Sequence, residues 1–380
     1  MSGKKLKMGM IGGSLGAFMG EMHRIAVKFD EKVELVSGCF SRDYEKTLET
    51  GKELGIAEER LYENFEEMAQ KEADKIDFVS IVVPNYAHYD AAKPFLENGV
   101  NVYCEKPLTF TIEQAEELQE LTEKNDLLFG VNYSYSGYPM VKAAREMVQR
   151  GDIGEVHTVM GEYPQDYLLA SMKEGEEKDI SNWRIEPEIA GRSNCVGDIG
   201  SHIENTVSYI TGLDIDSVCA KLDTISGASE LDDNGQIMVK FDNGASGMYW
   251  CSQVASSHDN ALKVRIYGDE GSIFWEQESP AYLTYTPIDG PKQVLSRGRD
   301  DIPSQAQELI RIPAGHPEGL FSSFANMYSN YIDAVKAKKE GNYEEDKFDY
   351  RTVEEGVKGV KFIHACVDSS EQGAKWVELD

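Results

Sequence analysis

The stretch Met8-Gly-Met-Ile-Gly-Gly-Ser-Leu-Gly-Ala-Phe-Met-Gly20 decides the fold of this chain. Its apolar start predicts a short strand, and glycines then precede a stretch of helical pattern. At such a turn, a backbone without side chains can approach a pyrophosphate at the helix N-terminus. The spacing departs from a plain Gly-x-Gly-x-x-Gly, because Ser14 stands at the second glycine and Gly12, Gly16 and Gly20 fit instead. Taken alone, the stretch leaves a simple tight turn as the alternative.

The segments that follow this turn alternate between strand and helix patterns. Short β-rich runs predict strands at residues 8–11, 33–40, 78–83, 102–104 and 127–131. Apolar residues at three- and four-residue spacing predict helices at 44–54, 88–98 and 112–125 between them. This alternation is typical of βαβ units and a parallel sheet. We therefore predict an α/β fold whose residues 1–131 form a Rossmann dinucleotide-binding domain.

The rest of the chain, residues 132–380, has a different pattern. Asn243-Gly244 separates two alternating runs at 236–241 and 245–251, which predicts a hairpin because Asn-Gly tolerates the positive φ angles of a tight turn. A second hairpin is predicted from 262–267 and 272–275, and helices are predicted at 141–150, 321–338 and 353–369. We predict an α+β domain with an open, mostly antiparallel sheet.

Composition narrows the possible partners and the compartment. The 380 residues include 38 Lys and Arg against 67 Asp and Glu, a formal charge of −29 that repels nucleic-acid phosphates and anionic lipids. An uninterrupted apolar run of membrane-spanning length is absent from the sequence. The six cysteines lie far apart without a Cys-x-x-Cys pair or a Cys/His cluster, as in a reducing cytoplasm. We expect a cytoplasmic enzyme that binds no nucleic acid, membrane or metal, with His23, His157, His258 and His364 as solvated or core residues.

The end of the second predicted strand bears on the choice of nicotinamide cofactor. An acidic residue there binds the ribose hydroxyls of NAD, whereas an Arg accommodates the 2′-phosphate of NADP. Ser41 takes the acidic position and Arg42 follows, which favours NADP slightly. A shift of one residue brings Asp43 into play instead, so both NAD and NADP stay open.

Two further groups have the chemistry of an oxidoreductase site. Glu105-Lys106-Pro107 stands at the carboxyl end of the fourth predicted strand, the edge at which open α/β sheets bind ligands. Asp198 and His202 are four residues apart in a predicted helix, which places them on one face. A His beside a carboxylate suits a general base, because the carboxylate fixes its tautomer and stabilises the imidazolium.

In this order, the glycine turn, Val83-Pro84-Asn85 with His88, Glu105-Lys106-Pro107, and Asp198 with His202 resemble the Gfo/Idh/MocA oxidoreductase family, over nearly the whole chain. The resemblance implies that Lys106 hydrogen-bonds the reacting hydroxyl, that His202 accepts its proton, and that Asp198 orients the substrate or the base. It also implies a Rossmann domain followed by a domain whose sheet binds sugar and mediates a homodimer or homotetramer.

The same resemblance assigns the cofactor contacts. The phosphates would lie against Gly12, Gly13, Ser14 and Gly16, and the adenosine ribose near Ser41 and Arg42. The nicotinamide ribose would be bordered by Pro84, Asn85 and His88, with Glu105 and Lys106 alongside. One departure is Asn205, which stands where many members have Asp, so an acidic role at that position is in doubt.

Three segments resemble those of members that act on sugars, glycosides or cyclitols. They supply aromatic rings for sugar faces and polar groups for hydroxyls, namely Tyr163, Gln165, Asp166, Trp183, Arg184 and His316. The predicted reaction transfers hydride between a secondary hydroxyl and NAD or NADP, giving a keto-sugar or inosose. The alternatives are a redox-neutral enzyme that retains NAD, and a dinucleotide-dependent binding module without turnover.

Overall fold

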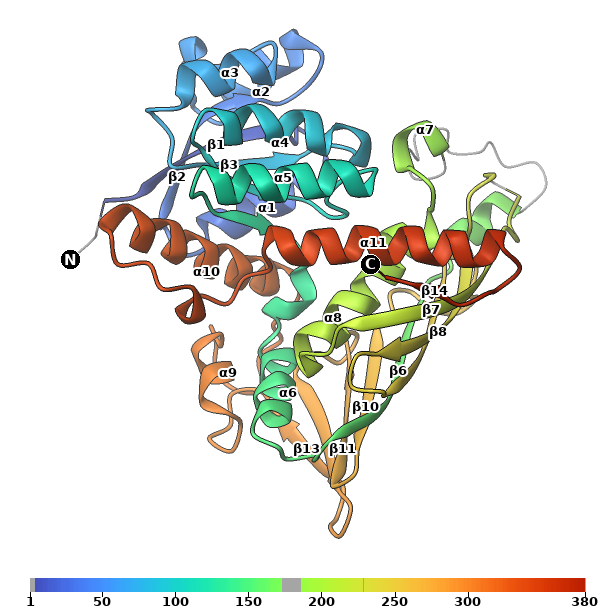
Figure 1. Cartoon of the computed structure of the whole chain (residues 1–380). Coiled ribbons are helices and arrows are strands. Elements are labelled where there is room, and N and C mark those ends of the chain that lie inside the picture. Colours follow the sequence, from blue (N-terminus) through green and yellow to red (C-terminus); the bar gives the residue numbers. More distant parts are fainter. Residues whose placement is uncertain (1–3, 173–185, 228, 380) are drawn as a thin grey trace. The chain divides into compact units, whose positions relative to one another are not determined.

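The computed structural model describes residues 4–172, 186–227 and 229–379, and the chain divides into two compact units (Figure 1). The first unit comprises Met1–Ser134 and Leu320–Val357. The second comprises Tyr135–Gly319 and Lys358–Asp380. Each unit has its own sheet and its own hydrophobic core.

The first unit contains a five-stranded parallel sheet in the order β2-β1-β3-β4-β5, as predicted for a Rossmann domain. The strands are β1 (Leu6–Gly12), β2 (Val33–Cys39), β3 (Phe78–Val82), β4 (Asn101–Cys104) and β5 (Phe129–Val131). The strand order reverses at β1, so the carboxyl ends of β1 and β3 flank the switch point at which such sheets bind ligands. The cofactor residues predicted from the sequence follow the strands at this edge.

Helices cover both faces of the parallel sheet. They are α1 (Phe18–Lys28), α2 (Tyr44–Glu53), α3 (Phe65–Glu72), α4 (His88–Glu97), α5 (Ile112–Lys124) and α10 (Leu320–Glu340). Helix α1 packs beside α10, and α3, α4 and α5 pack side by side (Figure 1). The buried Tyr331 of α10 donates to the carbonyl oxygens of Val102 and Leu128. A helix from the C-terminal part of the sequence therefore completes the core of the first unit.

The second unit contains a nine-stranded sheet in the order β13-β12-β11-β10-β6-β9-β8-β7-β14. Its strands are β6 (Val156–Pro164), β7 (Ile215–Asp223), β8 (Asn234–Phe241), β9 (Ser246–Ser252), β10 (Lys263–Gly268), β11 (Gly271–Glu276), β12 (Tyr282–Pro287), β13 (Gln293–Ser296) and β14 (Val377–Glu378). The β6–β9 pair is parallel and the other pairs are antiparallel. The predicted, mostly antiparallel sheet is confirmed, including the β8–β9 hairpin, whose turn places Gly244 at φ +86°.

One face of this sheet carries the core of the second unit. Its helices are α6 (Pro139–Gln149), α7 (Pro187–Ala190), α8 (Ser201–Thr211), α9 (Ser304–Glu308) and the greater part of α11 (Val353–Glu371). Buried residues of α6, α8 and α11 pack against Trp275 and Tyr249 of the strands. Along β8 buried and exposed residues alternate, as expected for a sheet with one covered face. Within the described ranges, the helices lack the combination of length and hydropathy needed to cross a membrane.

Candidate active site

The glycine turn joins β1 to α1 at the carboxyl edge of the parallel sheet. Gly12, Gly13 and Gly16 have φ angles of +76°, +67° and +82°, which favour glycine. A Cβ on Gly12 would lie 2.2 Å from the Val82 carbonyl oxygen, and one on Gly20 would lie 2.4 Å from the Cα of Gly13. These glycines therefore let β1, β3 and α1 approach each other closely.

The N-terminus of α1 lacks a side-chain cap, unlike three other helices of the same unit. Asp43, Asn64 and Thr111 cap α2, α3 and α5, and Thr111 forms a capping box with Gln114. At α1 the N-cap residue is Ala17, which offers the first-turn N–H groups no side-chain acceptor. Free amide donors beside a bare glycine turn fit the pyrophosphate of a dinucleotide. Ser14, half-buried on this turn, accepts the Ala17 N–H through its carbonyl oxygen at 3.1 Å.

The segment after β2 resolves the local roles of Ser41, Arg42 and Asp43. The Asp43 carboxylate accepts the Glu45 N–H at 3.1 Å and caps α2. The Asp43 N–H donates to the Ser41 hydroxyl oxygen at 3.1 Å. Arg42 is exposed. Asp43 is thus engaged by its own helix, while Arg42 is open to a ligand.

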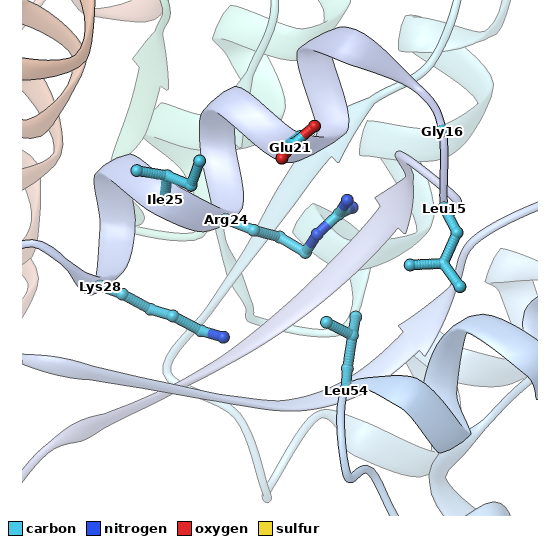
Figure 2. Close-up of a pocket in the computed structure, with 7 residues that line it drawn as sticks. All are labelled: Leu15, Gly16, Glu21, Arg24, Ile25, Lys28 and Leu54. Atoms are coloured by element: carbon cyan, nitrogen blue, oxygen red, sulfur yellow. The ribbon is translucent and has the colours of Figure 1, made fainter.

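A pocket of about 430 Å³ borders the glycine turn (Figure 2). Arg24 and Lys28 extend into it from α1 toward Leu15 and Leu54. Arg24 also donates to the Gly13 carbonyl oxygen and so braces the turn. Gly16 belongs to the pocket lining, whereas Ser41, Pro84 and Glu105 are not among its residues. The pocket therefore shares Gly16 with the predicted cofactor contacts and otherwise lies beside the glycine turn.

His88 links the loops that follow β3 and β4. Pro84 and the buried Asn85 begin the short turn before α4, whose first residue is His88. The ring nitrogens of His88 lie 2.7 Å from the Pro107 carbonyl oxygen and 2.9 Å from that of Val83. Burial lowers the pKa of His88 against the opposing effect of these carbonyls. His88 therefore holds Pro84-Asn85 next to Glu105-Lys106-Pro107.

Glu105 lies at the centre of a buried polar network, and Lys106 beside it is half-buried. One carboxylate oxygen, Oε1, lies 2.6 Å from His23 Nε2 and accepts from the Asn132 amide at 2.5 Å. The other, Oε2, accepts the Lys106 N–H at 3.2 Å. Burial raises the pKa of Glu105, but the bonds from His23 and Asn132 and the charges of His23 and Lys106 outweigh it and lower the pKa.

The segment of Asp198 and His202 differs from the predicted regular helix. Val196–Gly200 forms a π-helical turn that leads into α8, so Asp198 lies in this turn and His202 in the α-helix that follows. Buried Asp232 holds the start of this segment, because its carboxylate accepts the N–H groups of Asn194 and Val196 at 3.0 and 2.9 Å. Burial raises the pKa of Asp232 although these donors oppose it.

A chain of amide side chains connects this region to Asp198. The Asn194 amide donates to Gln253 Oε1 at 2.6 Å, and the Gln253 amide donates to Asp198 Oδ2 at 3.2 Å. Gln253 is fully buried. Asp198 is therefore oriented by a neutral side chain that the sequence did not single out.

Aromatic and amide groups gather around His202 in the second unit. The Tyr135 ring lies edge-on to the His202 ring at 4.8 Å, and the Tyr163 ring lies 6.1 Å away. The Tyr135 and Tyr163 hydroxyls are hydrogen-bonded to each other. Asn260 Oδ1 accepts from the Tyr163 hydroxyl at 2.6 Å and from the Gln165 amide at 2.7 Å. The structure thus brings together His202, Tyr163 and Gln165, and it adds Tyr135 and Asn260.

The other predicted substrate residues make different contacts or fall outside the described residues. Asp166 accepts the Ser257 N–H at 3.3 Å. His316 is exposed in a loop braced by the buried Arg297–Glu318 pair, whose atoms lie 2.6 Å apart. Trp183 and Arg184 fall outside the described residues.

The residues missed by sequence analysis share one property: their partners are distant in the chain. His23 and Glu105 are 82 residues apart, and Tyr163 and Asn260 are 97 apart. One signal was available for His23, which follows Gly20 by three residues and so shares its face of α1. Across the described ranges, His, Cys, Asp and Glu do not form a group of three or more suited to a metal ion.

Comparison with known proteins agrees with this geometry. The family profile "Oxidoreductase family, NAD-binding Rossmann fold" matches residues 6–133, and "GFO/IDH/MocA C-terminal domain" matches residues 141–274. The uncharacterised oxidoreductase YfiI of Bacillus subtilis is 33% identical, over 99% of this chain and 97% of its own.

Solved structures extend the comparison over the full length. An oxidoreductase from Sinorhizobium meliloti has 41% identity and a TM-score of 0.89, covering 99% of this chain and 100% of its own. An inositol dehydrogenase homologue from Azotobacter vinelandii, complexed with NADH and myo-inositol, has 30% identity and a TM-score of 0.91, covering 99% and 98%. With the glycine turn, these matches define an NAD(P)-dependent oxidoreductase. The chain belongs to the Gfo/Idh/MocA family, and the predicted resemblance is confirmed.

Proposed function

We propose that this oxidoreductase transfers hydride between a secondary hydroxyl of a sugar, glycoside or cyclitol and a nicotinamide cofactor, giving a keto-sugar or inosose. The observation that carries the proposal is the cluster of His202, Tyr135, Tyr163, Gln165 and Asn260 in the second unit. It combines aromatic rings with several hydroxyl and amide groups, which suits a ligand rich in hydroxyls. The Azotobacter homologue crystallised with myo-inositol supports the same substrate class.

In the proposed reaction, Lys106 and His202 have different roles. The Lys106 ammonium donates a hydrogen bond to the reacting oxygen and stabilises negative charge on it. His202 accepts the hydroxyl proton on a ring nitrogen, and Asp198 orients the imidazole or the substrate. When bound, the nicotinamide supplies the hydride acceptor. Burial beside Tyr135 raises the pKa of Tyr163 well above its usual value, so its hydroxyl stays protonated and keeps its hydrogen bond to Asn260.

The glycine turn and the free amides of α1 are the proposed contacts of the cofactor phosphates, with Gly12, Gly13, Ser14 and Gly16 lining them. Pro84, Asn85 and His88, held beside Glu105, are the proposed border of the nicotinamide ribose.

NADP is the cofactor that the segment after β2 favours. The Asp43 carboxylate caps α2, and Ser41 and Arg42 are not acidic. The segment therefore does not direct a carboxylate at the ribose hydroxyls. We expect Arg42→Ala to lower kcat/KM for NADP relative to NAD by about tenfold or more, the loss of one charge-assisted hydrogen bond. Steady-state rates with each cofactor measure this ratio. An unchanged ratio would leave Arg42 as a solvated charge.

A panel of hexoses, glycosides and inositols, each with excess NAD or NADP, tests the proposed function. Growth of reduced-nicotinamide absorbance with a narrow set of substrates is the expected result. Silence across the panel contradicts it. If nucleotide is then released on denaturing the silent protein, a redox-neutral enzyme with retained NAD replaces the proposal; if none is released and added nucleotide binds, a binding module does.

A further inference from the structure

We propose that His23 is a positioning residue for the reaction: by holding one oxygen of Glu105, it leaves the other to fix the backbone of Lys106. The inference rests on the proposed role of Lys106. His23 is a buried residue of α1 that has no role in the proposed reaction as described above. His23, Glu105, Lys106, Asn132 and Tyr328 all belong to the first unit.

The geometry of Glu105 assigns its two oxygens to different tasks. Oε1 is shared by His23 Nε2 at 2.6 Å and the Asn132 amide at 2.5 Å. Oε2 accepts the N–H of Lys106 at 3.2 Å. The Asn132 amide is itself held, because its Oδ1 accepts from the Tyr103 hydroxyl at 2.9 Å. The carboxylate can therefore turn only if His23 and Asn132 release it.

His23 is fixed from its other side as well. It is 0% exposed, and its Nδ1 lies 2.6 Å from the Tyr328 hydroxyl, which lies 2.7 Å from the Ser80 hydroxyl. With a neutral ring, Ser80 donates to Tyr328, Tyr328 donates to Nδ1, and Nε2–H donates to Glu105. With a charged ring, Nδ1–H donates to Tyr328, which donates to Ser80. Either protonation state leaves a donor on Nε2 for Glu105.

A buried histidine with this many polar partners is costly to build for packing alone. For packing, an apolar residue at position 23 with apolar residues in place of Tyr328 and Ser80 would fill the same space without buried hydrogen bonds. The chain instead ends this hydrogen-bonded series at the carboxylate adjacent to Lys106. That placement points to control of Glu105.

The charge of Glu105 depends on the same contacts. The pKa of this carboxyl lies below its usual value because the bonds and charges of its partners outweigh burial. Loss of His23 removes the hydrogen bond and the charge interaction by which this ring lowers the pKa of Glu105, so that pKa should rise. The titratable or charged groups that face or adjoin Glu105 are His23, His88, Tyr103, Cys104, Lys106 and Tyr328.

Two substitutions of His23 separate its two contacts. A Gln side chain places its amide nitrogen as many bonds from Cα as Nε2, so His23→Gln keeps a donor for Glu105. An Asn side chain places its amide nitrogen at the distance of Nδ1, so His23→Asn keeps a partner for Tyr328 and loses Glu105. Both remove the ring and its charge. The pair therefore differs in the contact to the carboxylate and by one methylene group, and the pH profile separates the two effects.

In the holoenzyme we expect His23→Asn to lower kcat by about 10²-fold, the cost of misplacing a reacting group by about 1 Å. KM for the hydroxyl substrate should change little, and the acid limb of the kcat profile should move to higher pH. His23→Gln should restore most of kcat. Equal losses in the two variants with unmoved pH profiles would reduce His23 to a packing residue and overturn the proposal.

A second measurement does not need turnover. Infrared difference spectra of the full chain report protonation of buried carboxyls, and Glu105→Gln identifies the band. This band should titrate at higher pH in His23→Asn than in the wild type, with His23→Gln between them. An identical titration in all three overturns this inference even if the dehydrogenase is active. A shifted titration in a protein without hydroxyl-dependent turnover supports the His23–Glu105 link and refutes the proposed function instead.

Discussion

Glu105 in the first unit and Asp232 in the second are nearly equally buried, at 8% and 7% exposed, yet their pKa values move in opposite directions. Both accept backbone N–H groups beside a proposed catalytic residue. Glu105 also has Lys106 as a cationic neighbour and the His23 ring, which can carry a charge, whereas the donors of Asp232 are neutral. Burial alone therefore does not set the charge of a carboxyl, and the chemical nature of the partners decides it.

Lys106, which follows Glu105, and His202, which belongs to the same unit as Asp232, are the proposed reacting groups. The largest expected effect is the removal of those groups. Lys106→Met and His202→Asn should each lower kcat by about 10²- to 10⁴-fold, the usual contribution of a positioned acid or base. Steady-state kinetics with the hydroxyl substrate measure the loss, and titration with reduced nucleotide should show that binding persists.

Matched controls for these variants lie on the surface. Lys124→Met in α5 and His157→Asn in β6 replace exposed residues of the same types, and both should keep wild-type kcat. Near-normal turnover in Lys106→Met or His202→Asn would refute the role of that residue.

A smaller effect is expected in the pH dependence of stability. The folded-state pKa of Glu105 lies below the ordinary 4.5, so its stabilising contribution is present above that value and is lost as pH falls through the folded pKa. The folded-state pKa of Asp232 lies above the ordinary 3.8, so its contribution is present below that value and is lost as pH rises. The destabilisation caused by Glu105→Gln should therefore grow with rising pH, whereas that caused by Asp232→Asn should shrink.

Denaturant unfolding midpoints at a series of pH values, on each side of 4, measure both slopes. The two carboxyls serve as controls for each other, because each variant removes one charge from an equally buried position. Slopes of the same sign would show that cationic partners do not distinguish the two carboxyls.

The parts of this fold that the sequence predicts are those decided by neighbouring residues. Gly12 and Gly16 mark the turn, Asn243-Gly244 marks a hairpin, and the Thr111 box marks the start of a helix. In each case a backbone angle or a cap depends on residues within four positions. Local periodicity therefore suffices to predict the parallel sheet and the mostly antiparallel one.

The support of the site depends on long-range contacts, which local periodicity does not contain. His23 meets Tyr328 across 305 residues, and α10, although predicted as a helix, gives no sign of the sheet on which it packs. The start of the π-helical segment before Asp198 is held by hydrogen bonds to Asp232, 36 and 38 residues from its donors Val196 and Asn194. The sequence thus predicts candidate reacting groups but not the side chains that orient them.

The smallest expected effect concerns Gln253, the neutral counterpart of His23. Its amide gives Asp198 one uncharged hydrogen bond at 3.2 Å, so Gln253→Met, which keeps the length of the side chain, should lower kcat by about fivefold, the net value of one neutral bond. The exposed Gln236→Met in β8 is the matched control and should leave kcat unchanged. If Gln253→Met instead matches the loss expected for His23→Asn, then the Gln253 amide orients its carboxylate as strongly as the His23 ring does. The charge of the partner would then have no bearing on catalysis, because the geometry of the hydrogen bond alone would account for the loss of kcat in both variants.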